Sequence, residues 1–96
     1  SVRKENDVFS LGAVLYEMVT GARPYEGSYQ TKLAKAYILA SHRAPGVSLA
    51  LDALIDRALE PDADKRIPSP AEFWKQLNAV PEATEPAREV YPAYAR

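Results

Sequence analysis

The side chains that could perform acid–base or metal chemistry are few and scattered in this chain. His42 is the single histidine, cysteine is absent, and no acidic cluster accompanies His42 at the spacing of metal ligands. A lone loop histidine is therefore expected at the surface, without a metal or catalytic role. Asp7, Glu17 and Arg66 are charged residues whose roles depend on the elements that carry them.

Composition limits the class of protein. With 96 residues the chain forms at most one small domain. The net charge of -1, with Lys and Arg spread along the chain, argues against nucleic-acid binding and against a basic membrane patch. No apolar run reaches the roughly 20 residues that span a bilayer. The absence of cysteine fits a reducing cytoplasm, and a first residue other than Met suggests a segment of a longer protein.

The stretch from Asp7 to Gly21 organises the rest of the chain. Its apolar residues fall on one helical face at Val8, Leu11, Leu15 and Met18, and on a second face at Phe9, Ala13, Val14 and Val19. A helix over 7–20 that is apolar nearly all round is expected to be buried. Asp7 is expected to be its N-cap and Gly21 its C-cap. Gly12 inside the helix predicts a close approach of another element.

Three further helices are predicted, so the fold class is all-α. They span 28–40 with Ser28 as N-cap, 49–59 with Ser48 as N-cap, and 69–79 with Ser69 as N-cap, Pro70 at the first position and Glu72 completing a capping box. Residues 81–96 are rich in Pro and Glu and lack a sustained apolar period, which predicts a flexible tail or linker after a domain over 1–80.

The central stretch resembles a known family. Asp7-Val8-Phe9-Ser10-Leu11-Gly12 is similar to the Asp-x-Trp/Phe-Ser-x-Gly signature of the central C-lobe helix in eukaryotic-like Ser/Thr protein kinases, and Tyr16-Glu17-Met18 with Gly21-x-x-Pro24-Tyr25 continue that pattern. Leu51 to Arg66 also match, except that Ala63 or Asp64 stands where many members have proline. The resemblance covers Asp7 to Leu77, is closest to bacterial members, and implies the last third of a kinase domain.

The resemblance implies a parent protein that transfers the ATP γ-phosphate to protein Ser or Thr, with ATP and Mg²⁺ as cofactors. Catalysis needs a Gly-rich loop, a lysine, a catalytic Asp and metal-binding Asp and Asn. None of these motifs is present, and His42-Arg43-Ala44 lacks the aspartate of His-Arg-Asp. We therefore expect no catalytic, cofactor-binding or metal-binding residue in this chain.

Five residues carry expectations from the resemblance. Asp7 would anchor the catalytic loop through backbone amides, although plain helix capping is the simpler interpretation. Val14 and Met18 would anchor the hydrophobic column beneath the adenine ring, or simply pack in the core. Glu17 could contact a substrate arginine or form an ion pair within the lobe. Arg66 matches the partner of the activation-segment Glu, and here should be solvated or pair with Asp62 or Asp64.

Two functional hypotheses follow. The first is the C-terminal scaffold and substrate-docking part of a kinase, whose second helix, with Tyr25, Glu26 and Tyr29 before it, contacts substrates or regulators unless it is only a solvated helix face. The second is a non-catalytic helical interaction module or kinase relic. Because three short helices cannot cover the central helix, the isolated chain is expected to expose an apolar patch and to self-associate or be partly ordered.

Overall fold

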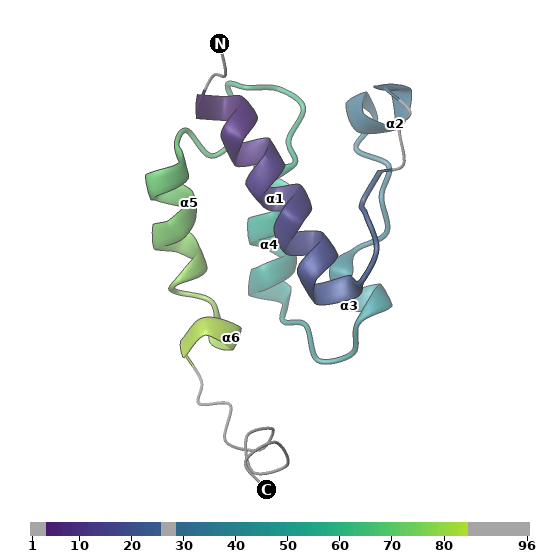
Figure 1. Cartoon of the computed structure of the whole chain (residues 1–96), viewed down its shortest axis with the longest axis vertical. Coiled ribbons are helices and arrows are strands. Elements are labelled where there is room, and N and C mark those ends of the chain that lie inside the picture. The colour runs from purple at the N-terminus through teal and green to yellow at the C-terminus, as the bar shows by residue number, and fades with distance from the viewer. Residues whose placement is uncertain (1–3, 26–28, 85–96) are drawn as a thin grey trace, which may run out of the picture.

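The computed structural model describes residues 4–25 and 29–84, and these ranges contain helices and no strand (Figure 1). The helices are α1 Lys4–Thr20, α2 Tyr29–Leu33, α3 Ala40–Arg43, α4 Leu49–Ala58, α5 Pro70–Leu77 and α6 Pro81–Thr84. The predicted all-α class is confirmed.

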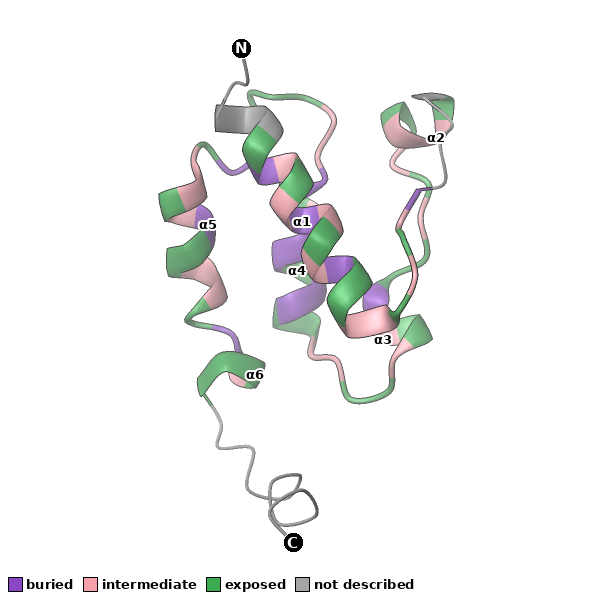
Figure 2. Cartoon of the chain, in the orientation of Figure 1, coloured by how far each residue is buried: buried purple, intermediate pink, exposed green. Residues whose placement is uncertain are grey.

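The core lies where α1 crosses α4, with α5 packed against both (Figures 1 and 2). Its fully buried large side chains are Val8, Tyr16, Leu51, Leu54, Ile55, Leu59 and Phe73. Gly12 sits at the crossing, where a Cβ atom on this residue would lie 2.6 Å from the Cβ atom of Ala58. The close approach predicted from Gly12 is confirmed, and the partner is α4.

The predicted N-caps Ser48 of α4 and Ser69 of α5 are also confirmed, but the Glu72 carboxylate accepts from the Gln76 side-chain amide at 2.9 Å and not from the Ser69 amide, so only half of the predicted capping box forms. The Ser48 hydroxyl accepts from the Leu51 amide at 3.0 Å, and the Ser69 hydroxyl accepts from the Glu72 amide at 3.2 Å. Pro70 occupies the start of α5, where its missing N–H leaves no donor unpaired. These local signals fix where both helices begin.

The ends of α1 differ in how well the sequence predicted them. Gly21 takes the left-handed conformation with φ 77°, and its amide donates to the Glu17 carbonyl at 2.8 Å, as expected of a C-cap glycine. The helix begins at Lys4, however, so the expectation that Asp7 is the N-cap is wrong. Lys and Glu are good helix formers, and the helix extends through them to include Asp7 in its first turn.

The predicted second helix over 28–40 is too long. The structure has α2 only from Tyr29 to Leu33, and the proposed N-cap Ser28 lies outside the described residues. The Lys35 amide donates to the Lys32 carbonyl and the Ala36 amide to the Thr31 carbonyl, a Schellman ending with Lys35 in the left-handed region at φ 56°. Glycine usually occupies this position, so a lysine at residue 35 did not indicate from the sequence that the helix ends here.

Two short helices were not predicted. The Asp52 carboxylate, 6% exposed, accepts from the Ser41 amide at 3.0 Å and so caps α3 from α4. In the stretch predicted as a tail, α6 is tied to α4, because the Ser48 amide and hydroxyl donate to the two Glu82 carboxylate oxygens at 2.6 and 2.7 Å. Residues 85–96 lie outside the described residues, and the division at residue 80 stays a prediction.

Candidate functional site

The side of α1 that carries Val14 and Met18 has no covering element in the described part of the chain. Val14 is 54% and Met18 is 76% exposed, whereas Val8 and Tyr16 of the same helix are fully buried against the other helices. We call Val14 and Met18 the open face of α1. Two large apolar side chains this exposed on one side of a central helix make that side a candidate contact surface.

A groove of about 300 Å³ runs beside the open face. Its walls come from α1 and from the segment that follows α1, and they comprise Phe9, Ala13, Val14, Glu17, Arg23, Pro24, Tyr25 and Lys32. Aromatic and aliphatic side chains line it together with one acidic and two basic groups. Pro24 and Tyr25 were singled out from the sequence, but Arg23 and Lys32 were not, because their place beside α1 depends on the return of the chain after Gly21.

A chain of aromatic rings joins α1 to the segment that carries α2. Phe9 stacks on Tyr25 with centroids 6.4 Å apart, Tyr25 meets Tyr37 edge to face at 5.7 Å, and Tyr37 meets Tyr16 edge to face at 5.7 Å. The Tyr16 hydroxyl donates to the Ile38 carbonyl. Burial raises the pKa of the Tyr25 phenol, whose oxygen has no hydrogen-bond partner among the described residues. The rings hold this segment at the groove.

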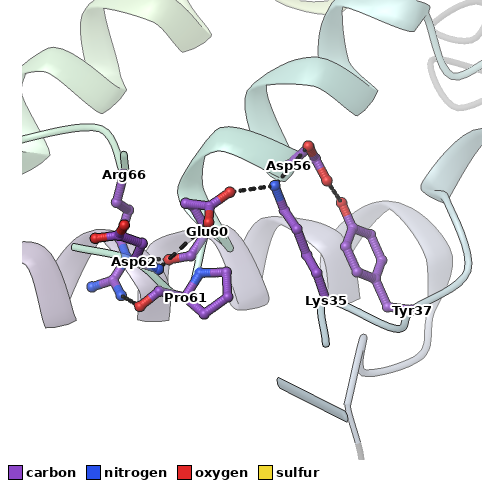
Figure 3. Close-up of polar contacts among 7 residues, drawn as sticks. All are labelled: Lys35, Tyr37, Asp56, Glu60, Pro61, Asp62 and Arg66. Carbon is purple, nitrogen blue, oxygen red and sulfur yellow. Dashed lines mark hydrogen bonds and ion pairs between the residues drawn. The ribbon is translucent and has the colours of Figure 1, made fainter. Parts of the chain in front are cut away.

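Arg66 lies at the outer end of the aromatic chain. Its guanidinium carbon is 5.5 Å from the Phe9 ring centroid, a cation–π distance. Its Nε donates to the Glu60 carbonyl at 2.7 Å and its Nη2 to the Pro61 carbonyl at 3.1 Å (Figure 3). Arg66 is therefore half-buried and held by backbone oxygens and an aromatic face, contacts that the sequence did not indicate.

A polar cluster fixes the end of the α2 segment on α4. The Lys35 ammonium lies 2.9 Å from Asp56 Oδ2 and 2.7 Å from Glu60 Oε2, and the Tyr37 hydroxyl donates to Asp56 Oδ1 at 2.8 Å (Figure 3). Burial opposes the charge on Lys35, but its hydrogen bonds to Glu60 and Asp56 outweigh burial and raise its pKa. The Lys35 hydrogen bond lowers the pKa of Glu60.

The remaining sequence-predicted residues do not meet in one cluster. Asp7 is exposed in the first turn of α1, and Glu17 is exposed at the wall of the groove. Nothing in the structure tests their expected contacts with a catalytic loop or a substrate. Within residues 4–25 and 29–84, no group of three His, Cys, Asp or Glu side chains could hold a metal ion. None of the described helices is long and apolar enough to cross a membrane.

Comparison with known proteins identifies relatives of this chain. The serine/threonine-protein kinase PknB of Mycobacterium leprae is 35% identical over 85 residues, which cover 83% of this chain and 14% of that protein. PknB of Mycolicibacterium smegmatis is 34% identical over 91 residues, 90% of this chain and 15% of that protein. PknA of Corynebacterium glutamicum is 34% identical over 84 residues, 82% of this chain and 17% of that protein.

No protein-family model matches the chain. The chain spans about 14% of the length of the first of these relatives. The predicted resemblance is nevertheless confirmed, since the chain is homologous to a segment of bacterial serine/threonine-protein kinases.

Proposed function

We propose that this chain, as a homologue of a segment of bacterial serine/threonine-protein kinases, is the C-terminal helical part of a kinase catalytic domain. Its role is to carry the rest of that domain on α1 and to dock protein substrates or regulators beside α1. The parent protein would transfer the ATP γ-phosphate to Ser or Thr side chains in the cytoplasm. ATP and Mg²⁺ would be held by parts of the parent outside this chain.

The open face of α1 is the observation that carries the proposal. Val14 and Met18 are four residues apart and lie on one side of the helix, while the opposite side is sealed in the core with Val8 and Tyr16. A helix with one buried and one uncovered apolar side is expected where two halves of a larger core meet. In the parent kinase, Val14 and Met18 would anchor the hydrophobic column beneath the nucleotide.

We assign roles to three charged residues from the same match to a kinase domain. Asp7, exposed here, would accept backbone amides of the catalytic loop. Arg66 would bind the activation-segment Glu, because its position over Phe9 leaves it at the same end of α1 as Asp7. The carboxylate of Glu17, at the wall of the groove, would accept hydrogen bonds from a basic side chain of a substrate.

The test replaces Val14 by Asp in the complete gene product and in the 96-residue chain. In the complete protein, a buried carboxylate should cost several kcal/mol and abolish phosphate transfer from labelled ATP. In the 96-residue chain, at a concentration where it is monomeric, the same change should alter the free energy of unfolding by less than about 1 kcal/mol, because Val14 is 54% exposed.

Leu49→Asp is the matched control, since Leu49 is an apolar residue 81% exposed on α4. It should leave phosphate transfer by the complete gene product unchanged, and it should alter the free energy of unfolding of the 96-residue chain by less than about 0.5 kcal/mol. Full activity of the Val14→Asp variant in the complete gene product would contradict the proposal.

The alternative function is a non-catalytic module that binds a separate protein through the same surface. The groove favours it as a second candidate, because its apolar lining with one acidic and two basic side chains suits a protein segment. In that case the complete gene product should show no phosphate transfer at all, whereas Val14→Asp should still abolish binding of the partner.

A further inference from the structure

A second groove, of about 310 Å³, lies between α4 and α5. It is lined by Ala50, Ala53, Arg57, Gln76, Ala79 and Val80. Four of these residues are alanine or valine, and three of them carry only a methyl group, so the chain's own side chains leave the groove unfilled. A lining of small apolar groups suits the insertion of larger apolar side chains.

One end of this α4–α5 groove is polar and positively charged. Arg57 Nε and Nη2 donate to the Gln76 side-chain oxygen at 3.2 and 2.6 Å, and the Gln76 amide donates to Glu72 at 2.9 Å. No carboxylate within the described ranges forms an ion pair with Arg57. A neutral amide therefore orients the guanidinium, whose charge is available to an acidic group that enters the groove.

The described chain ends beside the open end of this groove. Ala79 and Val80 line it, and α6 follows at once. The two hydrogen bonds from Ser48 to Glu82 hold α6 at the start of α4, next to Ala50. The chain therefore leaves the described region at Thr84, beside this groove.

The sequence of the segment after Thr84 complements the groove. Glu89-Val90-Tyr91 places one carboxylate next to two large apolar side chains. Glu89 lies five residues after Thr84, a reach of about 17 Å when extended. Ala50 and Arg57 are seven residues apart on α4, a rise of about 10 Å along the helix axis. The segment is long enough to turn back and place Glu89 at Arg57.

We propose that residues 85–96 bind in the α4–α5 groove, with Val90 and Tyr91 against the alanines and Glu89 paired with Arg57. Tethering favours this occupant, because a segment anchored at the mouth has an effective concentration on the order of millimolar without any partner. The bound segment would cover the α4–α5 side of the domain while the open face of α1 stays accessible.

The test is site-specific disulfide formation in the complete gene product, with the linked peptides identified by mass spectrometry. These 96 residues contain no cysteine, so each introduced pair is unambiguous within them. Ala53→Cys reports the groove and Ala93→Cys reports the segment. The control pair joins Ala93→Cys to Pro45→Cys, an exposed position three residues before Ser48. The groove pair should link at least about tenfold faster than the control pair.

A charge swap makes the test specific. Arg57→Glu should slow the groove pair to the control rate, and adding Glu89→Arg should restore it. Equal rates for both pairs, or no effect of Arg57→Glu, would overturn the proposal. Disulfides between two copies would also overturn it and would assign the groove to a second copy of the chain.

Discussion

Gly12 and Ala58 mark the point at which α1 and α4 touch, and only hydrogen at Gly12 fits there. A Cβ atom on Gly12 would lie 2.6 Å from the Ala58 Cβ atom, which has no rotatable bond with which to move away. The two helices can cross closely because one of them lacks a side chain at the crossing.

Gly12→Ala should therefore destabilise the fold, although alanine is the better helix former by about 1 kcal/mol. We expect a net loss of about 1–3 kcal/mol in the free energy of unfolding, measured by urea denaturation, because the helices must separate. Adding Ala58→Gly should recover part of the loss by making room. An increase in stability on Gly12→Ala alone would show that the crossing is looser than described.

Lys35 combines a left-handed backbone with two ion pairs, and two substitutions separate these features. Lys35→Met keeps the unfavourable φ and loses the bonds to Asp56 and Glu60, with an expected loss of roughly 1 kcal/mol, since Asp56 is partly exposed. Lys35→Gly loses the same bonds but relieves the backbone, so it should be about 1 kcal/mol more stable than Lys35→Met. Thermal unfolding of the pair measures the difference, and equal midpoints would argue against backbone strain.

The pH dependence of stability should show the contribution of Glu60. Its pKa is lowered below 4.5 by the Lys35 hydrogen bond, so its stabilising effect is present above that value and is lost as the pH falls through the folded-state pKa. The urea midpoint should fall on acidification below about pH 4.5. The decrease in the urea midpoint should be smaller in the Lys35→Met variant. If the midpoint of the variant decreased as much as that of the wild type, Glu60 would not account for the pH dependence.

Substitutions of Ser48 should differ in their cost to stability, depending on whether they keep the cap of α4 or the contact with Glu82. Ser48→Ala loses both the cap of α4 and the hydroxyl bond to Glu82, with an expected loss of about 1 kcal/mol. Glu82→Gln keeps the cap of α4, so it should lower the free energy of unfolding less than Ser48→Ala does. Ser48→Asp retains a cap but places a carboxylate against Glu82, and Glu82→Gln should improve this variant. Calorimetry of the four proteins tests the ranking.

Self-association of the 96-residue chain should depend on the open face of α1. We expect oligomers by light scattering on a gel-filtration peak, because Val14 and Met18 are largely exposed. Val14→Lys with Met18→Lys should shift the peak to the monomer, whereas Leu49→Lys should not. A monomeric wild-type chain with one sharp unfolding transition would instead support an independent module.

Local patterns predicted α1, α4 and α5 because their apolar periodicity and caps lie within a few residues. The structure shows the predicted N-caps at Ser48 and Ser69 and the predicted C-cap at Gly21. The end of α2 could not be predicted, since Lys35 takes a glycine position with its ammonium held by Asp56 and Glu60, more than 20 residues away. The short α3 likewise depends on Asp52 in another helix.

The candidate site was predicted less completely than the fold. The apolar excess of α1 indicated an uncovered face, and Val14 and Met18 are on it. Arg23, Lys32 and the ring chain from Phe9 to Tyr16 come together only through tertiary packing, so no sequence spacing could reveal them.

The link between Ser48 and Glu82 closes the chain into a loop that contains α4 and α5 and ends with α6. Because α4 and α5 pack on each other and on α1 in one core, these helices should open as one cooperative unit in native-state hydrogen exchange, whether or not this link is intact. Amides of α4 and α5 should then share a single opening free energy, while those of α2, held through Lys35 and the aromatic rings, should exchange faster and independently. The opening of α4 and α5 would thus report the global unfolding of the core, whereas the opening of α2 would be a local event.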